Sequence, residues 1–311
     1  AQQIKPMKVL ILDEDYRQYQ QLLLAQGVAA DAGCDPTVFP ADYDALLAQP
    51  DLAARYLEQG GQTPWVQSTW AGVDALVTAA GAAGVVVTGV KDIFGPQMAE
   101  YVFGYLLSDV RSLSFFRAQQ DSRCWSPVPP KTLVGKTMSV LGTGTIGAHV
   151  AGVAQSFGME TRGVSRSGQR HKNFDVVGSA DEILNVLAGT DVLINTLPGT
   201  EQTRGILNAS LLDVLSTDAT LFNLGRGNAL CEDGLRNWLK VHERASAVLD
   251  VFAAEPLASD HWLWQHPQIS ITPHISAFSF PGDVVKLFLE NLRLRSRGDD
   301  LEHVIDLDLG Y

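Results

Sequence analysis

The segment "TMSVLGTGTIGAHVAGVAQSFGMETRGVSRSG", residues 137–168, restricts the fold of this chain more than any other part of it. Its glycines are spaced as G-x-G-x-x-G between an apolar strand pattern and an amphipathic helix pattern, and a second strand pattern follows. The first glycine of such a loop permits a tight turn, the second lets the backbone approach a pyrophosphate, and the third allows close helix packing. The helix N-terminus then faces the phosphates. The segment therefore predicts a dinucleotide-binding βαβ unit whose cofactor-facing residues are Gly142, Gly144, Thr145, Ile146 and Gly147.

The same alternation of strand and helix patterns runs through most of the sequence. Several of the predicted strands are continuous apolar runs, which are typical of strands buried on both faces of a parallel sheet. Helical patterns of about ten residues separate them, as βαβ units require. We therefore predict an α/β fold with strands at residues 8–12, 65–68, 85–88, 138–141, 160–164, 192–196, 220–223, 247–251 and 269–272.

Two longer helical patterns indicate where domains meet. Residues 96–120 begin with a proline, which suits the first turn of a helix, and end before "WSPVPPK", whose prolines exclude regular structure. Residues 281–297 form the second pattern. Because a chain of 311 residues exceeds the usual size of a single core, we expect two domains with boundaries near these helices.

Composition excludes several classes of protein. A formal net charge of −12 argues against a nucleic-acid partner, because nucleic-acid binders concentrate Lys and Arg on one surface. No apolar run is long enough to predict a membrane span, and no secretion signal is recognisable. Cys34, Cys124 and Cys231 match no metal-binding spacing and suit reduced thiols. We expect a soluble cytoplasmic protein without a metal site, in which residues 1–6 precede a natural-looking start at Met7.

The end of the second strand of the βαβ unit indicates which dinucleotide binds. An acidic residue there normally holds the ribose 2′-hydroxyl of NAD, but this chain has Ser165, Arg166 and Ser167 instead. A guanidinium can bind a 2′-phosphate through charge-assisted hydrogen bonds, and the two hydroxyls can assist it. We therefore predict NADPH as the cofactor; the alternative is that Arg166 is a solvated surface charge.

Three segments after the glycine loop have the pattern of strand ends: "LFNLGRGNAL", "AVLDVFAAEPL" and "ITPHIS". In an open parallel sheet, the carboxyl ends of the strands border the ligand crevice. We therefore expect one side of the sheet to carry Arg226, Asp250, Glu255 and His274. Each of them alone has a structural interpretation, as an ion pair, a strand-end or loop carboxylate, or a packed histidine. Together they indicate a catalytic site.

In chain order, the motifs G-x-G-x-x-G, N-L-G-R-G, L-D-V-F-x-x-E-P-L and T-P-H resemble those of the D-isomer-specific 2-hydroxyacid dehydrogenase family, over nearly the whole chain. The segments "SRS", "WLWQHP" and "TPHISA" look most like the shorter bacterial glyoxylate/hydroxypyruvate reductases. The resemblance implies that Arg226 binds the carboxylate and carbonyl of a 2-keto acid, that His274 is the acid/base, and that Glu255 pairs with it. Hydride transfer places negative charge on the carbonyl oxygen, which a proton donor and a fixed cation can neutralise.

The resemblance also assigns residues around the reaction centre. In "STWAGVD", the turn formed by Trp70, Ala71 and Gly72 would offer backbone N–H groups to the substrate carboxylate, although a turn without a ligand has the same pattern. Asp250 would lie on the nicotinamide side, although a structural acid at a strand end fits its position equally well. The other implied cofactor contacts are Leu197, Pro198, Thr203, Leu224, Gly225 and Ala277.

For the fold, the resemblance implies two doubly wound parallel-sheet domains, with a Rossmann nucleotide-binding domain inserted into a flavodoxin-like substrate domain. The substrate domain would comprise residues 7–95 and 277–311, and the nucleotide domain residues 96–276. Homodimers are usual in the family, and Trp125 resembles a position near the dimer arm.

We therefore expect an NADPH-dependent reductase of glyoxylate, hydroxypyruvate or similar small 2-keto acids. One alternative is an NAD-linked dehydrogenase of another 2-hydroxy acid, which the missing acidic residue after the second strand disfavours. Another is a dinucleotide-sensing corepressor or scaffold, because a fold alone does not determine a function.

Overall fold

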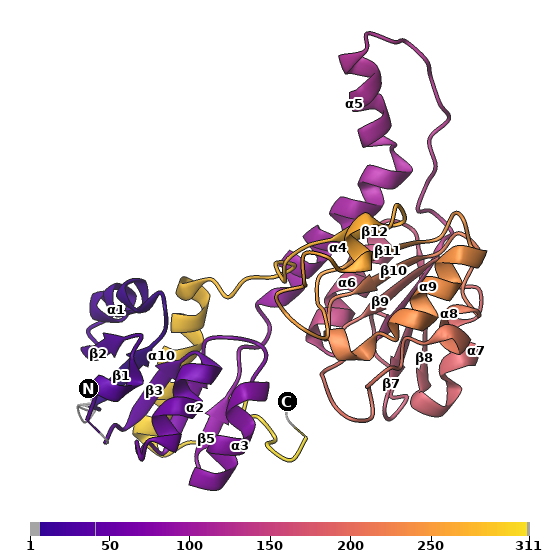
Figure 1. Ribbon diagram of the computed structural model, residues 1–311. Coiled ribbons are helices and arrows are strands. Elements are labelled where there is room, and N and C mark those ends of the chain that lie inside the picture. The colour runs from indigo at the N-terminus through magenta and orange to yellow at the C-terminus, as the bar shows by residue number, and fades with distance from the viewer. Residues whose placement is uncertain (1–6, 41, 310–311) are drawn as a thin grey trace. The chain divides into compact units, whose positions relative to one another are not determined.

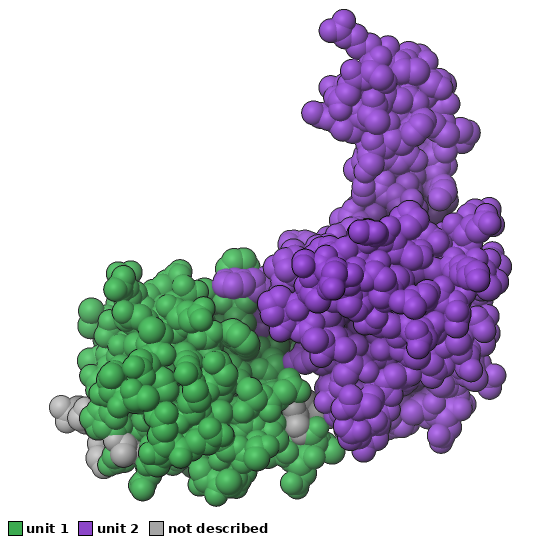
Figure 2. Space-filling view, viewed as in Figure 1, with its two compact units in different colours: residues 1–93, 279–311 green, residues 94–278 purple. Residues whose placement is uncertain are grey.

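The computed structural model describes residues 7–40 and 42–309. The chain divides into two compact units (Figure 2): unit 1 comprises Ala1–Ile93 and Ser279–Tyr311, and unit 2 comprises Phe94–Phe278. Each crossover between the units lies two residues from the predicted domain boundary, at 93/94 rather than 95/96 and at 278/279 rather than 276/277. The prediction about residues 1–6 lies outside the described residues.

Unit 1 contains a five-stranded parallel sheet with the order β2-β1-β3-β4-β5. This is the strand order of flavodoxin-like folds. The strands are β1 (Val9–Leu12), β2 (Ala30–Gly33), β3 (Ala45–Ala48), β4 (Trp65–Ser68) and β5 (Val86–Thr88). The helices are α1 (Tyr16–Ala25), η1 (Pro36–Val38), α2 (Pro50–Glu58), α3 (Asp74–Ala83) and α10 (Pro281–Arg297).

Helices cover both faces of the unit 1 sheet (Figure 1), as the continuous apolar strands predicted. Side chains that alternate along the strands, such as Leu10 and Leu12, join the cluster formed with α2 and α3. On the other face, the Trp65 ring stacks on Phe288 of α10 with ring centroids 5.1 Å apart. Because both faces are covered, the strands β1, β3 and β4 are buried along their whole length.

Unit 2 contains a seven-stranded parallel sheet with the order β12-β11-β10-β9-β6-β7-β8. From β6 onward this is the Rossmann order 3-2-1-4-5-6 with one added strand. The strands are β6 (Thr137–Leu141), β7 (Glu160–Ser165), β8 (Val176–Ser179), β9 (Val192–Asn195), β10 (Thr220–Asn223), β11 (Ser246–Leu249) and β12 (Ile269–Ile271). The helices are α4 (Phe94–Val110), α5 (Leu113–Asp121), α6 (Thr145–Ser156), η2 (Ala180–Glu182), α7 (Ile183–Leu187), α8 (Ala209–Leu212), η3 (Gly227–Ala229), α9 (Glu232–Val241) and η4 (Trp262–Gln265).

Two helical layers enclose the unit 2 sheet. Leu221 and Leu249 pack in one cluster with Leu235 and Trp238 of α9. On the other face α4 packs against α6, and Tyr105 of α4 meets the edge of Phe222. The predicted α/β class with two doubly wound parallel-sheet domains is confirmed.

Two parts of the predicted secondary structure are wrong. The strands β2, β3 and β8 were not predicted, because β2 and β8 are half-exposed edge strands and β3 is the short run "ALLA". The helix predicted at residues 96–120 is two helices, α4 and α5, and Ser112 between them has a left-handed backbone with φ of 50°. Helix α5 and the segment after it extend away from the body of unit 2 (Figure 1).

Within the described part of the chain, no helix combines the length and apolar character that crossing a membrane would demand.

Candidate active site

The glycine loop joins β6 to α6 as predicted. Gly142 has φ of +99°, a conformation that favours glycine, and it makes the tight turn at the end of the strand. A Cβ atom on Gly147 would overlap the carbonyl oxygen of Gly142, so α6 approaches the loop at a distance that only glycine allows. The backbone path of a dinucleotide loop therefore depends on these two glycines.

Gly144, the middle glycine of the motif, borders open space. A Cβ atom on Gly144 would meet no other atom within 4 Å, although Gly144 is the N-cap residue of α6. No side chain caps this helix, and its first turn carries no acidic residue. Uncapped N–H groups and the positive end of the helix dipole favour an anion at such a position. The loop with Thr145 and Ile146 behind it therefore fits a pyrophosphate.

The end of β7 presents the three residues that were predicted to select the cofactor. Arg166 and Ser167 are exposed and Ser165 is half-buried. The Ser165 hydroxyl accepts a hydrogen bond from the Gly168 N–H at 3.1 Å, so this side chain also shapes the turn. Because no acidic residue stands at this strand end, the position fits a phosphate better than a free ribose hydroxyl.

Buried asparagines shape the loops after β9 and β10. The Asn195 side chain donates to Asn223 Oδ1 at 2.8 Å and accepts from the Leu197 N–H at 3.3 Å. Asn223 in turn donates to the Arg226 carbonyl at 3.3 Å. The loop that carries Leu197 is thereby tied to the loop that carries Arg226.

The predicted cofactor contacts on these two loops differ in accessibility. Leu197, Pro198 and Thr203 are half-buried, and Thr203 Oγ1 donates to the Pro198 carbonyl at 2.6 Å, which closes their loop. Leu224 and Gly225 are buried. These two residues can therefore meet a cofactor mainly through their backbone.

Arg226 lies three residues beyond β10, next to the loop that follows β11. Gly227 approaches the backbone of Phe252 so closely that a Cβ atom would overlap it. The half-buried Arg226 guanidinium donates from Nη1 to the Gly225 carbonyl at 2.9 Å, which bends the side chain back over its own loop. Since β10, β11 and β12 are adjacent parallel strands, their carboxyl ends bring the Arg226 loop beside those of Glu255 and His274.

His274 and Glu255 form the central pair of the site. The imidazole Nδ1 lies 2.8 Å from Glu255 Oε2, and Glu255 Oε1 accepts from the Phe252 N–H at 2.9 Å. Both side chains are partly exposed, at 50% for His274 and 36% for Glu255. The pair predicted from the sequence is therefore in hydrogen-bonding contact and open to a ligand.

Asp250 holds the segment that carries His274, residues 272–276, through hydrogen bonds. Its carboxylate is fully buried and accepts from the Ile275 N–H at 2.8 Å, the Ser276 N–H at 2.9 Å and the Thr272 hydroxyl at 2.6 Å. The Asp250 carbonyl accepts from the His274 N–H at 2.9 Å. The structure therefore favours the structural interpretation of Asp250 over a contact with a cofactor. Ala277, at the end of this segment, is half-buried.

The predicted substrate turn belongs to unit 1. Trp70, Ala71 and Gly72 lie between β4 and α3, where Trp70 and Ala71 are exposed. The Ser68 hydroxyl accepts from the Trp70 N–H at 3.1 Å and donates to its carbonyl at 2.7 Å. The turn is therefore held from its own strand.

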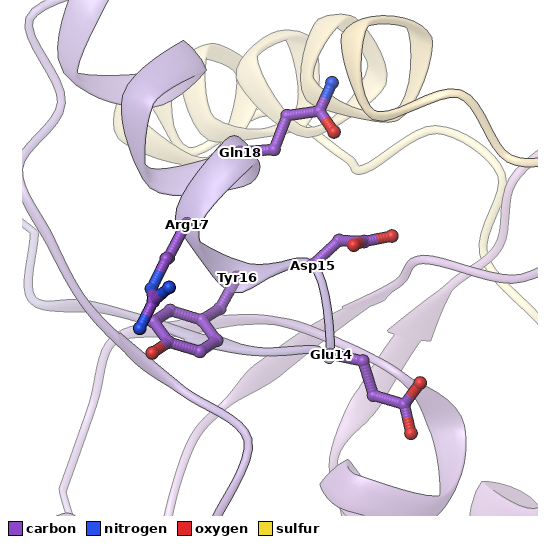
Figure 3. A pocket seen from close by; sticks show the side chains of 5 residues that line it. All are labelled: Glu14, Asp15, Tyr16, Arg17 and Gln18. Atoms are coloured by element: carbon purple, nitrogen blue, oxygen red, sulfur yellow. The ribbon is translucent and has the colours of Figure 1, made fainter.

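A separate surface pocket lies at the start of α1 (Figure 3). It is lined by Glu14, Asp15, Tyr16, Arg17 and Gln18, none of which was predicted to act in the site. The Arg17 guanidinium lies over the Tyr16 ring, 5.5 Å from its centroid. Among the described residues, His, Cys, Asp and Glu form no group of three or more that could hold a metal ion.

Sequence comparison places this geometry in a family. A profile of the D-isomer specific 2-hydroxyacid dehydrogenase NAD binding domain matches residues 103–276, more than half of the chain. The chain belongs to the D-isomer specific 2-hydroxyacid dehydrogenase family. A glyoxylate/hydroxypyruvate reductase A from Serratia proteamaculans is 34% identical over 299 residues, which cover 94% of each chain. One from Yersinia enterocolitica is 34% identical over 281 residues, 88% of each chain. The family prediction is confirmed.

Solved structures agree. A family member from Aeromonas salmonicida superposes with a TM-score of 0.90 at 39% identity, covering 98% of this chain and 100% of its own. An NADPH-dependent glyoxylate/hydroxypyruvate reductase from Sinorhizobium meliloti, in complex with NADP and sulfate, superposes with a TM-score of 0.84 at 26% identity. The alignment covers 98% of this chain and 99% of that one. The family's two-unit architecture therefore extends over nearly all of this chain.

Sequence reasoning missed the residues that hold the site together. Tyr101, whose hydroxyl lies 2.6 Å from Thr272 Oγ1, and Thr272 itself carry no pattern that distinguishes them from ordinary helix or strand-end residues. For Asn195 and Asn223 one signal was present: an amide at the last position of a buried apolar strand requires a hydrogen-bond partner.

Proposed function

We propose that this protein is an NADPH-dependent reductase that converts small 2-keto acids such as glyoxylate and hydroxypyruvate to 2-hydroxy acids. The observation that carries the proposal is the hydrogen-bonding distance of 2.8 Å between His274 and Glu255. The two residues follow β12 and β11, and the neighbouring strand β10 leads to Arg226. The names of the Serratia and Sinorhizobium relatives support this substrate class.

His274 would hold and transfer the proton. With Nδ1 engaged by Glu255, the Nε2 atom is the ring nitrogen left to face a carbonyl oxygen. The protonated ring can give its Nε2 proton to the carbonyl oxygen as negative charge develops there. In the reverse reaction, the neutral ring would accept the hydroxyl proton of the 2-hydroxy acid.

Arg226 would orient the substrate. A guanidinium remains charged at every working pH and presents paired N–H donors that match a carboxylate. The family resemblance also assigns backbone N–H groups of Trp70, Ala71 and Gly72 to a substrate carboxylate. These contacts would hold the carbonyl carbon in one orientation while the proton is transferred at its oxygen.

NADPH would bind along the glycine loop, where it supplies the hydride. The open space over Gly144 and the uncapped α6 terminus fit its pyrophosphate, and Ser165, Arg166 and Ser167 would bind its 2′-phosphate. Thr145, Ile146 and Gly147 would face the phosphates from the first helical turn. Backbone and side chains of Leu197, Pro198, Thr203, Leu224, Gly225 and Ala277 would line the nicotinamide side.

The test is a rate comparison with the purified protein. Glyoxylate, hydroxypyruvate and pyruvate are each assayed with NADPH and with NADH by loss of absorbance at the reduced nicotinamide band. We expect turnover of the first two acids and a preference for NADPH. A preference for NADH would contradict the cofactor assignment. Tight NADPH binding without turnover of any keto acid would instead favour a dinucleotide sensor.

We also propose that the protein is a cytoplasmic homodimer that pairs through α5 and the segment after it. Leu113, Phe115 and Phe116 on α5 are exposed, and Trp125 is 97% exposed, so this arm presents an apolar surface. Such surfaces mark protein contacts. Sedimentation equilibrium should give a dimer mass that shifts toward the monomer in the Phe116→Glu variant. A wild-type monomer at micromolar concentration would contradict the proposal.

A further inference from the structure

Two side chains of α4 hold the two ends of the segment that carries His274. Gln97 and Tyr101 are four residues apart, so they lie on the same face of the helix. Tyr101 contacts Thr272, two residues before the histidine, and Gln97 contacts Phe278, four residues after it. Between these anchors, Pro273, His274 and Ile275 are exposed.

The first anchor is a directed chain of hydrogen bonds. Thr272 Oγ1 lies 2.6 Å from Asp250 Oδ1 and also 2.6 Å from the Tyr101 hydroxyl. Because an ionised carboxylate only accepts, the single Thr272 proton points to Asp250 and Tyr101 donates to Thr272. Burial raises the pKa of Tyr101 far above its ordinary value, so the phenol keeps its proton.

The second anchor pairs a side-chain amide with a peptide group. Gln97 Nε2 donates to the Phe278 carbonyl at 2.9 Å, and Gln97 Oε1 accepts from the Phe278 N–H at 2.9 Å. Phe278 is the last residue of unit 2, and Gln97 stands in the first turn of α4, near the other crossover. One side chain thus satisfies both backbone groups of the residue at which the histidine segment leaves its unit.

The histidine itself needs such support. His274 has φ of +55°, in the left-handed region that residues other than glycine seldom adopt. A backbone in this region persists only when the surrounding contacts specify it. If either end of the segment relaxed, His274 could return to an extended backbone, and its ring would leave Glu255.

We propose that Tyr101 and Gln97 are positioning residues for His274, which hold its segment so that the ring meets Glu255 and faces the substrate. This inference rests on the proposed acid/base role of His274. Neither side chain hydrogen-bonds to His274 or Glu255: Tyr101 acts through the Thr272 hydroxyl, and Gln97 acts through the backbone of Phe278.

The kinetic test uses Tyr101→Phe, which removes one hydroxyl and keeps the ring. We expect kcat for glyoxylate reduction to fall about tenfold with little change in KM, because misplacing a catalytic group slows the step after binding. The control is Tyr43→Phe in unit 1, which loses a comparable 2.7 Å bond to Asp31 and should keep full kcat. The double variant Tyr101→Phe/Thr272→Val should have a kcat no lower than that of the slower single variant. The reason is that both changes break the same chain of hydrogen bonds, from Tyr101 through Thr272 to Asp250. Unchanged kcat in Tyr101→Phe, or additive losses, would overturn the proposal.

A second measurement does not depend on turnover. The imidazole resonances of His274, assigned by their loss in His274→Gln, are followed by NMR in the protein without substrate. In Tyr101→Phe and Gln97→Ala, the chemical shifts of the His274 imidazole should move toward the values found in Glu255→Gln. In Tyr43→Phe these chemical shifts should stay at the wild-type values. Identical His274 resonances in the wild type and both α4 variants would reject the positioning role. If the wild type reduces no keto acid, the proposed function fails, and this measurement still decides the structural claim.

Discussion

Glu255 uses both of its carboxylate oxygens, one on the ring of His274 and one on the backbone of its own loop. Oε2 lies 2.8 Å from His274 Nδ1, and Oε1 accepts from the Phe252 N–H at 2.9 Å. The second bond prevents the carboxylate from rotating away from the ring. The pair therefore fixes which ring nitrogen is left to face the substrate.

His274→Ala should lower kcat for keto-acid reduction by about 10²- to 10⁴-fold, the usual contribution of a general acid. The Kd for NADPH, followed by the change in nicotinamide fluorescence on binding, should change little, because the glycine loop is untouched. A variant that keeps more than a tenth of the wild-type kcat would exclude His274 as the proton donor.

Glu255→Gln keeps an oxygen for the Phe252 N–H and removes the charge beside the ring. The assay of keto-acid reduction should show kcat falling by about tenfold or more, because the ring loses the charge-assisted hydrogen bond that holds it in place. A kcat equal to the wild-type value would show that the carboxylate does not hold the ring in its working position.

Arg166→Ala should weaken NADPH binding and leave NADH binding nearly unchanged. A lost charge-assisted contact is worth about 1.5–3 kcal/mol, which corresponds to about a tenfold to hundredfold rise in the NADPH Kd. Both dissociation constants can be measured by fluorescence titration. The comparison variant is Arg170→Ala, an exposed arginine beyond the strand end, which should change the NADPH Kd less. Equal weakening of both cofactors would contradict a 2′-phosphate contact.

Gly144→Val should prevent cofactor binding while the protein stays folded. A Cβ atom at this position meets nothing within 4 Å beyond the neighbouring residues, so the cost to stability should be about 1 kcal/mol or less, chiefly from the poorer N-cap. Melting temperature and NADPH titration separate the two effects. Gly81→Ala, also in open space but inside α3, should leave the NADPH affinity unchanged and should not lower the melting temperature, because alanine favours a helix more than glycine does. Retained NADPH affinity in Gly144→Val would place the pyrophosphate elsewhere.

Lys136 should make the stability of unit 2 fall at high pH. Its ammonium lies 2.8 Å from Asp191 Oδ1, and this hydrogen bond raises the pKa of Lys136 above its ordinary value. A base whose pKa is raised by folding stabilises the protein below the unfolded pKa of about 10.4, and that contribution is lost as pH rises through the folded value.

The Lys136 side chain is 44% exposed, so solvent limits the effect to about 1 kcal/mol at most. Urea unfolding from pH 7 to pH 11 should show the wild-type advantage over Lys136→Met shrinking above about pH 10. Lys131→Met removes a pair that is 72% exposed on both sides, with atoms 3.6 Å apart, and should cost nothing measurable. A wild-type advantage that is independent of pH would contradict the ion pair.

Several features of the site were predictable because they follow from local backbone chemistry. The turn at Gly142 and the close packing at Gly147 are forced wherever a strand, a phosphate-binding turn and a helix meet. Arg226, Glu255 and His274 follow apolar strand patterns, and parallel strands deliver such residues to one edge. The alternation along the chain predicted both sheets, although it missed the short strand β3 and the half-exposed edge strands β2 and β8.

Other features depend on partners that are distant in the sequence. Tyr101 and Thr272 are 171 residues apart, and Gln97 and Phe278 are 181 apart. The residues around a tyrosine or a glutamine on a helix do not show whether its side chain has a hydrogen-bond partner in a distant segment. The break between α4 and α5 was also hidden, because the left-handed backbone of Ser112 interrupts no apolar pattern.

The sequence by itself determined the α/β class, the glycine loop and the family, and it predicted the histidine, the carboxylate and the arginine of the proposed site. These are properties of short motifs, in which residue type and spacing decide the chemistry. Only the tertiary structure decided that Asp250 is buried beneath the histidine segment, that His274 has a left-handed backbone, and that α4 holds both ends of that segment. The reason is physical: side-chain geometry in a site depends on hydrogen bonds between segments that meet only when the sheet and its helices are assembled.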